Sequence, residues 1–326
     1  MDKNIKLIEE LLDSKNKLLT EIHKVIVGQD EVINLLLISL LSKGHCLIVG
    51  VPGLAKTMLI SSFSKLIKLD FNRIQFTPDL LPSDIIGTEV LEEVKSTGKR
   101  MFRFIKGPVF SNVILADEIN RTPPKTQSAL LQAMQEYKVT TSGETFDLEL
   151  PFFVLATQNP IEQEGTYPLP EAQLDRFFFK ILIGYPTESE EKEIVKSIDT
   201  RDEVKLNAIL DGDAIKKLQH IVTQVPVSDA VVDFTVRLVS STRPESINAP
   251  DFIKNWVRWG AGPRATQNLI LGAKAKAILE ARYMVSIQDI KHLAFPVLRH
   301  RIIPNFNAEA EGVTVENIIE ELVKYV

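Results

Sequence analysis

The sequence predicts an α/β fold, in which a parallel sheet with helices on both faces is followed by a smaller, all-helical domain. Up to residue 185, short apolar runs typical of buried strands alternate with helical stretches, which is the pattern of a parallel sheet. From residue 186 onward, apolar residues recur at helical spacing instead. A chain of 326 residues is long enough for two domains, and we expect them over 1–185 and 186–326.

The predicted elements follow one another in a regular order. Apolar runs typical of buried strands occupy 45–49, 71–76, 113–116, 152–156 and 177–183. Helical periodicity in the first domain covers 5–19, 30–42 and 58–67. In the second domain it covers 213–225, 230–242, 264–281, 286–299 and 314–325. Thr187, a good N-cap before an acidic run, marks the start of that domain.

Composition excludes several classes of protein. Hydrophobic residues make up 44% and charged residues 25% of the chain, so it is a globular protein rather than a disordered or fibrous one. The net charge of −5 argues against a protein that binds nucleic acid mainly through phosphates. A single cysteine, Cys46, and five scattered histidines provide neither a disulfide framework nor a transition-metal site. We expect a cytosolic protein, because no apolar run reaches the ~20 residues of a membrane helix and no signal peptide is recognisable.

A glycine-rich loop between the first predicted strand and a helix is the strongest sign of function. Backbone N–H groups and the helix N-terminus favour a polyphosphate there. Lys56 would reach the β- and γ-phosphates, and the hydroxyl of Thr57 would ligate Mg²⁺. The general pattern has glycine where this chain has Ala55, which is compatible if that backbone is already entering the helix. The loop consists of Gly50, Val51, Pro52, Gly53, Leu54, Ala55, Lys56 and Thr57.

Two adjacent carboxylates, Asp117 and Glu118, directly follow another predicted strand. Ligand sites of parallel sheets lie at the carboxyl ends of the strands. Asp117 would hold the magnesium through water, and Glu118 would orient and deprotonate the attacking water. Alone, such a pair is more often a helix N-cap. The phosphate-binding loop upstream favours the catalytic interpretation.

A polar amide, Asn159, follows the strand predicted over 152–156. It could hydrogen-bond the nucleophilic water or the γ-phosphate of a bound nucleotide. Asn159 is followed by Pro160, and Asn-Pro is by itself a common turn. The hypothesis therefore depends on the loop and the acidic pair described above.

In this order, the segments GVPGLAKT, LADEINR, ATQNP and LPEAQLDRF resemble the AAA+ ATPases of the MoxR group. The segments 76–87 (FTPDLLPSDIIG) and 107–110 (GPVF) resemble that group as well. The resemblance extends from about Val27 to Arg301, which is most of the chain. Alanine at position 55 matches the usual loop of the group. The resemblance thus implies a P-loop AAA+ domain followed by a helical lid.

The resemblance also assigns roles to single residues. Asn159 matches sensor 1, Arg176 matches the arginine finger that reaches a neighbouring subunit, and Arg264 matches sensor 2 of the lid. The alternatives are a surface salt bridge for Arg176 and a solvated position in the first turn of a helix for Arg264. Arg121 could equally point across an interface. The segment that matches the one flanking the adenine consists of Val27, Gly28 and Gln29.

The function implied by the resemblance is Mg²⁺-dependent hydrolysis of ATP by a homo-oligomeric ring, expected to be a hexamer. Such proteins act like chaperones that mature or remodel other proteins, often with partners that carry a von Willebrand factor A domain. Insertions over 89–100 and 137–149 would form hairpins that face the pore or a face of the ring. The cluster Arg299-His300-Arg301 at a predicted helix end is expected to be solvated.

Three other functions compete with this one. A DNA-directed motor of related fold, such as a helicase, needs a basic pore, and the acidic composition disfavours it. A motor subunit of a metal chelatase has a similar core and is excluded only by the resemblance. A non-catalytic, nucleotide-gated scaffold would need neither Glu118 nor Asn159.

Overall fold

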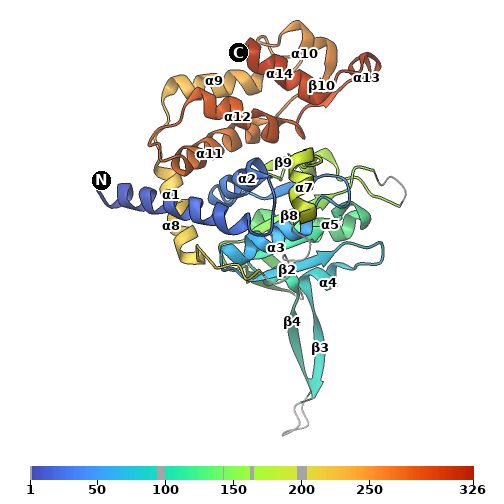
Figure 1. The fold of residues 1–326 in the computed structure, drawn as a ribbon. Helices are drawn as coiled ribbons and strands as arrows, with labels where there is room; N and C mark the ends of the chain where they lie inside the picture. Colours follow the sequence, from blue (N-terminus) through green and yellow to red (C-terminus); the bar gives the residue numbers. More distant parts are fainter. Residues whose placement is uncertain (1, 94–99, 142, 162–164, 197–203) are drawn as a thin grey trace.

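The computed structural model describes residues 2–93, 100–141, 143–161, 165–196 and 204–326, with side chains from residue 12 onward. A helical layer lies over one side of a central sheet region, and a two-stranded arm extends from the opposite side (Figure 1). Among the described residues, no helix combines the length and the apolar character needed to cross a membrane.

The central sheet has five strands in the order β2-β5-β8-β1-β9, and all its neighbouring strands are parallel. The predicted parallel sheet is therefore confirmed. Because β8 pairs in parallel with both β1 and β5, the carboxyl ends of these three strands lie at the same edge of the sheet. The strands are β1 (Cys46–Val49), β2 (Phe71–Gln75), β5 (Val113–Asp117), β8 (Phe153–Gln158) and β9 (Phe179–Leu182).

Alternate residues of the inner strands pack on opposite faces of the sheet, as the period of two in a strand requires. Cys46 and Ile48 belong to the larger apolar core, whereas Leu47 belongs to a second core on the other face. The larger core includes α3, and the second core includes α5. The helical elements of this domain are α1 (Asp2–Ile22), α2 (Asp30–Leu41), α3 (Lys56–Leu66), α4 (Pro82–Ile86), η1 (Pro108–Phe110), η2 (Ile119–Arg121), α5 (Pro124–Glu136) and α6 (Glu171–Leu174).

In its described residues, the second half of the chain is helical, as predicted, apart from one short antiparallel strand pair. That pair, β10 (Val257–Trp259) and β11 (Ile303–Pro304), is too short to show a strand period in the sequence. Helix α11 contacts α1 and α2 of the first domain, and one apolar core includes all three. The domain boundary near residue 185 therefore stays a prediction. The helices are α7 (Glu188–Lys196), α8 (Gly212–Gln224), α9 (Asp229–Ser240), α10 (Asp251–Trp256), α11 (Pro263–Leu279), α12 (Ile287–Leu298), α13 (Phe306–Glu311) and α14 (Val315–Tyr325).

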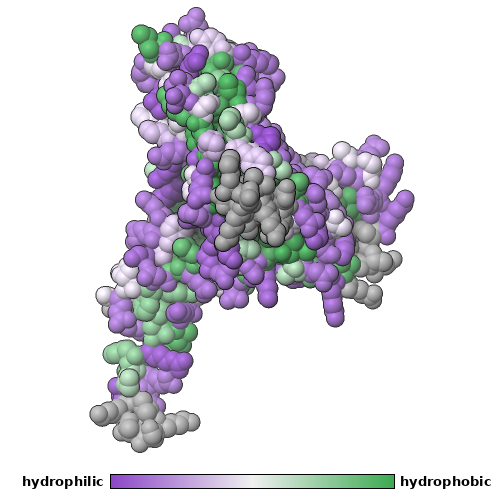
Figure 2. Space-filling model, turned by 90° about the vertical axis from the view of Figure 1, so that its left-hand side faces the viewer, coloured by the Kyte–Doolittle hydropathy of each residue, from purple (hydrophilic) through white to green (hydrophobic). Residues whose placement is uncertain are grey.

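Two hairpins occupy the predicted insertions. The arm in Figure 1 consists of β3 (Gly87–Glu93) and β4 (Arg100–Lys106), and the shorter hairpin consists of β6 (Lys138–Thr141) and β7 (Glu144–Asp147). Ser96, Thr97 and Gly98, which the sequence favours as the tip of the first hairpin, lie outside the described residues, as does Ser142 of the tip expected at Ser142-Gly143. Phe104 of the arm stacks on Phe146 of the shorter hairpin at 4.9 Å, which joins the two at their bases. Apolar side chains of the arm are exposed (Figure 2): Leu91, Met101 and Phe102 lie farther out than Phe104, and Ile105 lies next to it toward the base.

Candidate functional site

The glycine-rich loop connects the carboxyl end of β1 to the first residue of α3, Lys56. Gly53 has a φ of +85°, in the left-handed region that favours glycine. Ala55 also has a positive φ, 53°, with ψ at 25°. It is thus not yet in helical conformation, so the condition under which the sequence analysis found alanine compatible is not met. An alanine there costs about 1–2 kcal/mol relative to an ordinary conformation, which explains why P-loops generally have glycine at this position.

The side chain of Lys56 folds back over this loop. Its Nζ donates hydrogen bonds to the carbonyl oxygens of Gly50 and, at 2.8 Å, Val51. The cavity beside the loop has a volume of about 410 Å³. Its lining residues are Pro52, Gly53, Leu54, Ala55, Lys56, Thr57, Met58, Asp117, Glu118, Thr157 and Asn159. The structure therefore brings the loop, the acidic pair and the amide together at one edge of the sheet.

One threonine, Thr157 of β8, orients both members of the acidic pair. Its hydroxyl donates to Asp117 Oδ1 at 2.5 Å and accepts the backbone N–H of Glu118 at 2.9 Å. Asp117 is nearly buried, with 7% of its surface exposed. Glu118 has a φ of 57° and a ψ of 49°, which is unfavourable for a residue other than glycine. This conformation follows directly after β5 and is fixed by the bond to Thr157.

Two polar residues of the edge strand β2 hold the carboxylates from the other side. Arg73 donates to Asp117 Oδ2 from Nη2 at 2.6 Å and from Nε at 3.1 Å. Gln75 donates to Glu118 Oε2 at 2.8 Å, and its own Oε1 accepts from Arg73 at 2.7 Å. Arg121 lies 3.2 Å from the same Glu118 carboxylate. It therefore faces the acidic pair of its own chain here.

Arg73 and Gln75 are not recognisable as site residues from the sequence. Register pairs Gln75 with Asp117 and Arg73 with Leu115 in the neighbouring strand. The available signal was their i, i+2 spacing around the buried Ile74, which places both side chains on one face of the strand. Only the order of the strands, which the sequence does not show, places that face beside the acidic pair.

Asn159 contributes a buried amide that is only half satisfied. Its Oδ1 accepts the backbone N–H of Ile161 at 3.2 Å. Its Nδ2 is buried and has no hydrogen-bond acceptor among the described residues. A buried donor without an acceptor costs about 1–3 kcal/mol, and a donor that lines a cavity can be satisfied by an anion or a water bound there.

A second cavity of about 310 Å³ continues from Gly53, Leu54 and Ala55 toward Val27 and Gln29. Its other lining residues could not be identified from the sequence; they belong to α2, the end of β9, the segment that follows β9, and α7. Gly28 does not line it, and its φ of +65° lies in the region that favours glycine. Glu190 lies beside Gly28 and accepts the backbone N–H of Thr187, the predicted N-cap, at 2.7 Å. These lining residues are Val32, Leu182, Ile183, Gly184, Tyr185, Pro186, Glu190 and Ile194.

The two candidate arginines lie elsewhere. Arg176 and Arg264 line a third cavity, of about 230 Å³, together with Lys43 and His45. The backbone N–H of Phe178 donates to the carbonyl of His45, directly before β1, whereas the P-loop follows the other end of β1. Arg176 is thus at the amino edge of the sheet and Lys56 at the carboxyl edge. The four residues of β1 separate these edges by about 13 Å.

His45, in the wall of this third cavity, is a neutral residue. Its Nε2 donates to the Met134 carbonyl at 3.0 Å, and its Nδ1 accepts the backbone N–H of Val154 at 3.0 Å. Because burial penalises the charged form, the pKa of His45 is lowered to about 4. The positive charge of this cavity therefore comes from Lys43, Arg176 and Arg264.

This fold and this loop define a P-loop protein of the AAA class. Residues 45–179 match the family described as "ATPase family associated with various cellular activities (AAA)", and residues 253–322 match the family described as "AAA lid domain". Within this class, the chain belongs to the MoxR-type AAA+ ATPases, as its curated relatives show.

Those relatives align over most of their length. "Chaperone MoxR1" of Mycobacterium tuberculosis is 45% identical over 307 residues, which cover 94% of this chain and 80% of that protein. "Protein MoxR" of Methylorubrum extorquens is 30% identical over 301 residues, with 86% and 85% covered. A crystal structure from Cytophaga hutchinsonii, described as a candidate ATPase, has a TM-score of 0.89 and 44% identity over 98% of this chain and 96% of that one.

Proposed function

We propose that this chain is a Mg²⁺-dependent ATPase whose subunits complete one another's active sites in a homo-oligomeric ring. The observation that carries the proposal is the separation of its candidate groups. Each chain has a P-loop and an acidic pair at the carboxyl edge of its sheet, and two arginines at the amino edge. Phosphoryl transfer needs cationic stabilisation of the phosphate charge that develops. A neighbouring subunit can supply it when its amino edge docks on this carboxyl edge.

The residues around the P-loop fit a nucleotide with its magnesium ion. Lys56 and the loop N–H groups would bind the phosphates. Asn159 Nδ2, a buried donor, would donate a hydrogen bond to the γ-phosphate or to the attacking water. Thr57 and Asp117 would hold Mg²⁺, which typically takes one or two protein oxygens besides the phosphates and neutralises phosphate charge. The cavity beside Val27 and Gln29 is proposed for the adenine.

Glu118 is proposed as the general base for the attacking water. Its carboxylate lines the cavity but is held by Gln75 and Arg121. Gln75 and Arg121 both bind Oε2, so Oε1 is the oxygen that we propose accepts the proton of the attacking water. Thr157 keeps the backbone of Glu118 in place by accepting its N–H.

Ring formation, a hexameric ring in particular, and remodelling of partner proteins are further parts of the proposal. They rest on family membership, since a MoxR relative is named as a chaperone. Partners with a von Willebrand factor A domain and a cytosolic location belong to the same proposal. The net charge of −5 favours protein clients over DNA, and DNA should accordingly not stimulate the ATPase. Neither a DNA motor nor a chelatase subunit is favoured by any particular contact.

Mixed assemblies test the proposal. An Arg176→Ala subunit keeps its own P-loop cavity but provides no arginine finger to its neighbour. A Glu118→Gln subunit provides the arginine finger but has no general base in its own site. Each preparation alone should be nearly inactive, because an arginine finger contributes about 10³–10⁵ in rate. Mixtures should regain ATPase activity in proportion to the number of mixed interfaces, measured as phosphate release against mixing ratio. A flat background rate, with subunit exchange proven by fluorescence, would contradict the assignment in trans.

A further inference from the structure

The end of α12 is buried against the segment that carries the candidate finger. Arg301 is 5% exposed and His300 is 6% exposed, so the expectation of a solvated basic cluster is wrong. Each of the three residues Arg299, His300 and Arg301 donates to backbone carbonyls of the segment 175–180. The sequence could not show this, because the partners lie more than a hundred positions away.

Arg301 makes the largest share of these contacts. Its Nη2 donates to the carbonyls of Asp175 at 3.0 Å and Phe177 at 2.7 Å, the two residues on either side of Arg176. Its Nε donates to Asp175 Oδ1 at 2.7 Å. His300 Nε2 adds a bond of 3.1 Å to the Phe177 carbonyl. The backbone that presents Arg176 is therefore fixed on both sides by one guanidinium and one imidazole of the lid.

Asp175 is shared between two arginines of different exposure. Its Oδ1 accepts from Arg301, and its Oδ2 accepts from Arg264 Nη1 at 3.0 Å. The Arg301 side chain is 2% exposed, whereas that of Arg264 is 42% exposed and lines the third cavity. Burial lowers the pKa of Arg301 to about 10, so it stays charged at neutral pH and needs this carboxylate. The pair with Arg301 is structural, and the half-exposed Arg264 is free to exchange Asp175 for another anion.

We propose that Arg301 is the positioning residue of the arginine finger, and that Asp175 links it to Arg264 so that both cavity arginines are presented together. This inference rests on the proposed function, because it assumes that Arg176 acts on a neighbouring site. The planar guanidinium of Arg301 serves three acceptors of the finger segment at once. A lysine keeps the charge but has no planar group whose N–H donors point in these fixed directions.

Arg301→Lys is the test, because it retains the buried charge. We expect unchanged binding of a fluorescent ATP analogue, since the P-loop cavity is untouched. We expect kcat to fall about 10- to 100-fold, the range for a reacting group displaced by about 1 Å. Mixing with Glu118→Gln subunits should restore activity. The intact active site of an Arg301→Lys subunit then lies beside a Glu118→Gln subunit, whose Arg176 is correctly positioned. An unchanged kcat, or a loss that mixing does not restore, would overturn the proposal.

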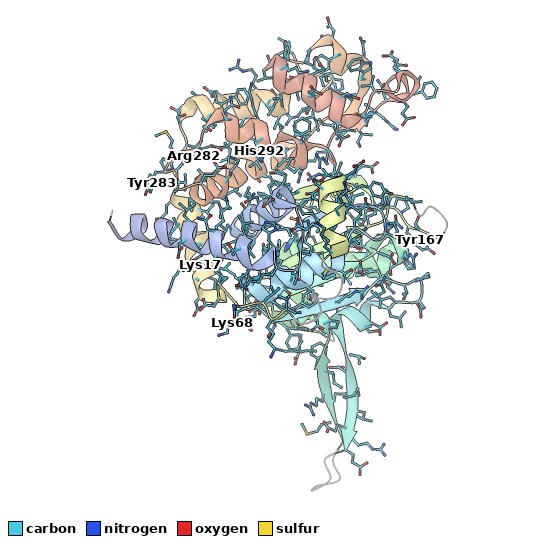
Figure 3. The ribbon with its side chains drawn as sticks, in the orientation of Figure 1. Lys17, Lys68, Tyr167, Arg282, Tyr283 and His292 are labelled. Carbon is cyan, nitrogen blue, oxygen red and sulfur yellow. The ribbon has the colours of Figure 1, made fainter. Side chains whose placement is uncertain are left out.

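Asp175→Asn provides a second route, which also serves if Arg301→Lys does not fold. It keeps the backbone carbonyl that Arg301 binds and removes the charge shared by the two arginines. The same loss of kcat and the same rescue are expected. Arg282→Lys is the matched control. Arg282 lies in the turn after α11 (Figure 3) and forms an ion pair with Asp289 of α12. Among the described residues, it has no contact with the finger segment. Its ATPase rate should not change.

The Arg176→Ala mixtures separate the two proposals. If they regain activity and the Arg301→Lys mixtures do not, only the positioning role is wrong. If the Arg176→Ala mixtures also stay inactive, the assignment of the finger in trans is itself wrong.

Discussion

The P-loop cavity and the arginine cavity have opposite character. The first lies at the carboxyl edge of the sheet and has two carboxylates, one lysine and a buried amide without an acceptor. The second lies at the amino edge and contains two arginines and a lysine, with no carboxylate in its described lining. In the proposed assembly, the two cavities are complementary halves of one site, which would meet only between subunits.

The largest expected effect tests whether the P-loop cavity binds nucleotide at all. Lys56→Ala removes the main side-chain charge for the phosphates and should abolish binding of ATP. Titration of a fluorescent ATP analogue measures this. Lys43→Ala, in the arginine cavity, is the control and should leave the affinity of an isolated subunit unchanged. Near-normal affinity in Lys56→Ala would mean that the loop binds no phosphate.

The next effect separates binding from chemistry within the P-loop cavity. Glu118→Gln should still bind Mg-ATP, because Asp117 remains for the metal. Its hydrolysis should be at least ~100-fold slower, the scale of general-base assistance, because an amide cannot accept the proton of water. Steady-state phosphate release and analogue titration are measured on the same preparation. Turnover within a few-fold of the parent would remove Glu118 from this role.

The arginine cavity should be the more acid-sensitive of the two. The unfolded chain protonates His45 near its ordinary pKa of about 6.5, whereas the folded chain does so only near 4. Stability present above pH 6.5 is therefore lost as the pH falls from about 6.5 to 4. This histidine accounts for a loss of about 3 kcal/mol across the window, and the pKa of buried His300 is lowered in the same direction.

Chemical denaturation at successive pH values measures this loss. His45→Gln should reduce the slope of stability against pH, because an amide can donate to Met134 and accept from Val154 without titrating. His220→Gln changes an exposed histidine and should leave the slope as it is. An unaltered slope in His45→Gln would place the acid sensitivity elsewhere.

The smallest effect concerns the backbone of the P-loop. Ala55→Gly relieves the left-handed conformation, and part of that gain is offset by the greater entropy of glycine in the unfolded chain. We expect a net stabilisation of up to about 1 kcal/mol, seen as a higher urea midpoint at unchanged slope. Ala133→Gly, inside helix α5, should instead be destabilising. A lower midpoint in Ala55→Gly would show that the alanine methyl group packs more favourably than its backbone costs.

The sequence predicted local features well and long-range ones poorly. All five strands of the sheet were predicted, as were the loop before α3 and the acidic pair at the end of β5, because each depends on a continuous run of residues. The contact of Arg73 with Asp117 and that of Arg301 with Asp175 depend on which elements become neighbours. These contacts are determined by the order of the strands and by the position of the lid helices. The hydrophobic periodicity of the sequence predicts neither.

The left-handed backbone conformation of Glu118 predicts different outcomes of selection for heat resistance and selection for ATP turnover. Glycine is the residue that this conformation favours, so selection for thermal stability alone would favour losing the carboxylate. If Glu118 is the general base, as proposed above, selection for turnover retains glutamate there. Libraries of this protein screened only for heat resistance should therefore accumulate glycine at position 118, whereas libraries screened for phosphate release should exclude it.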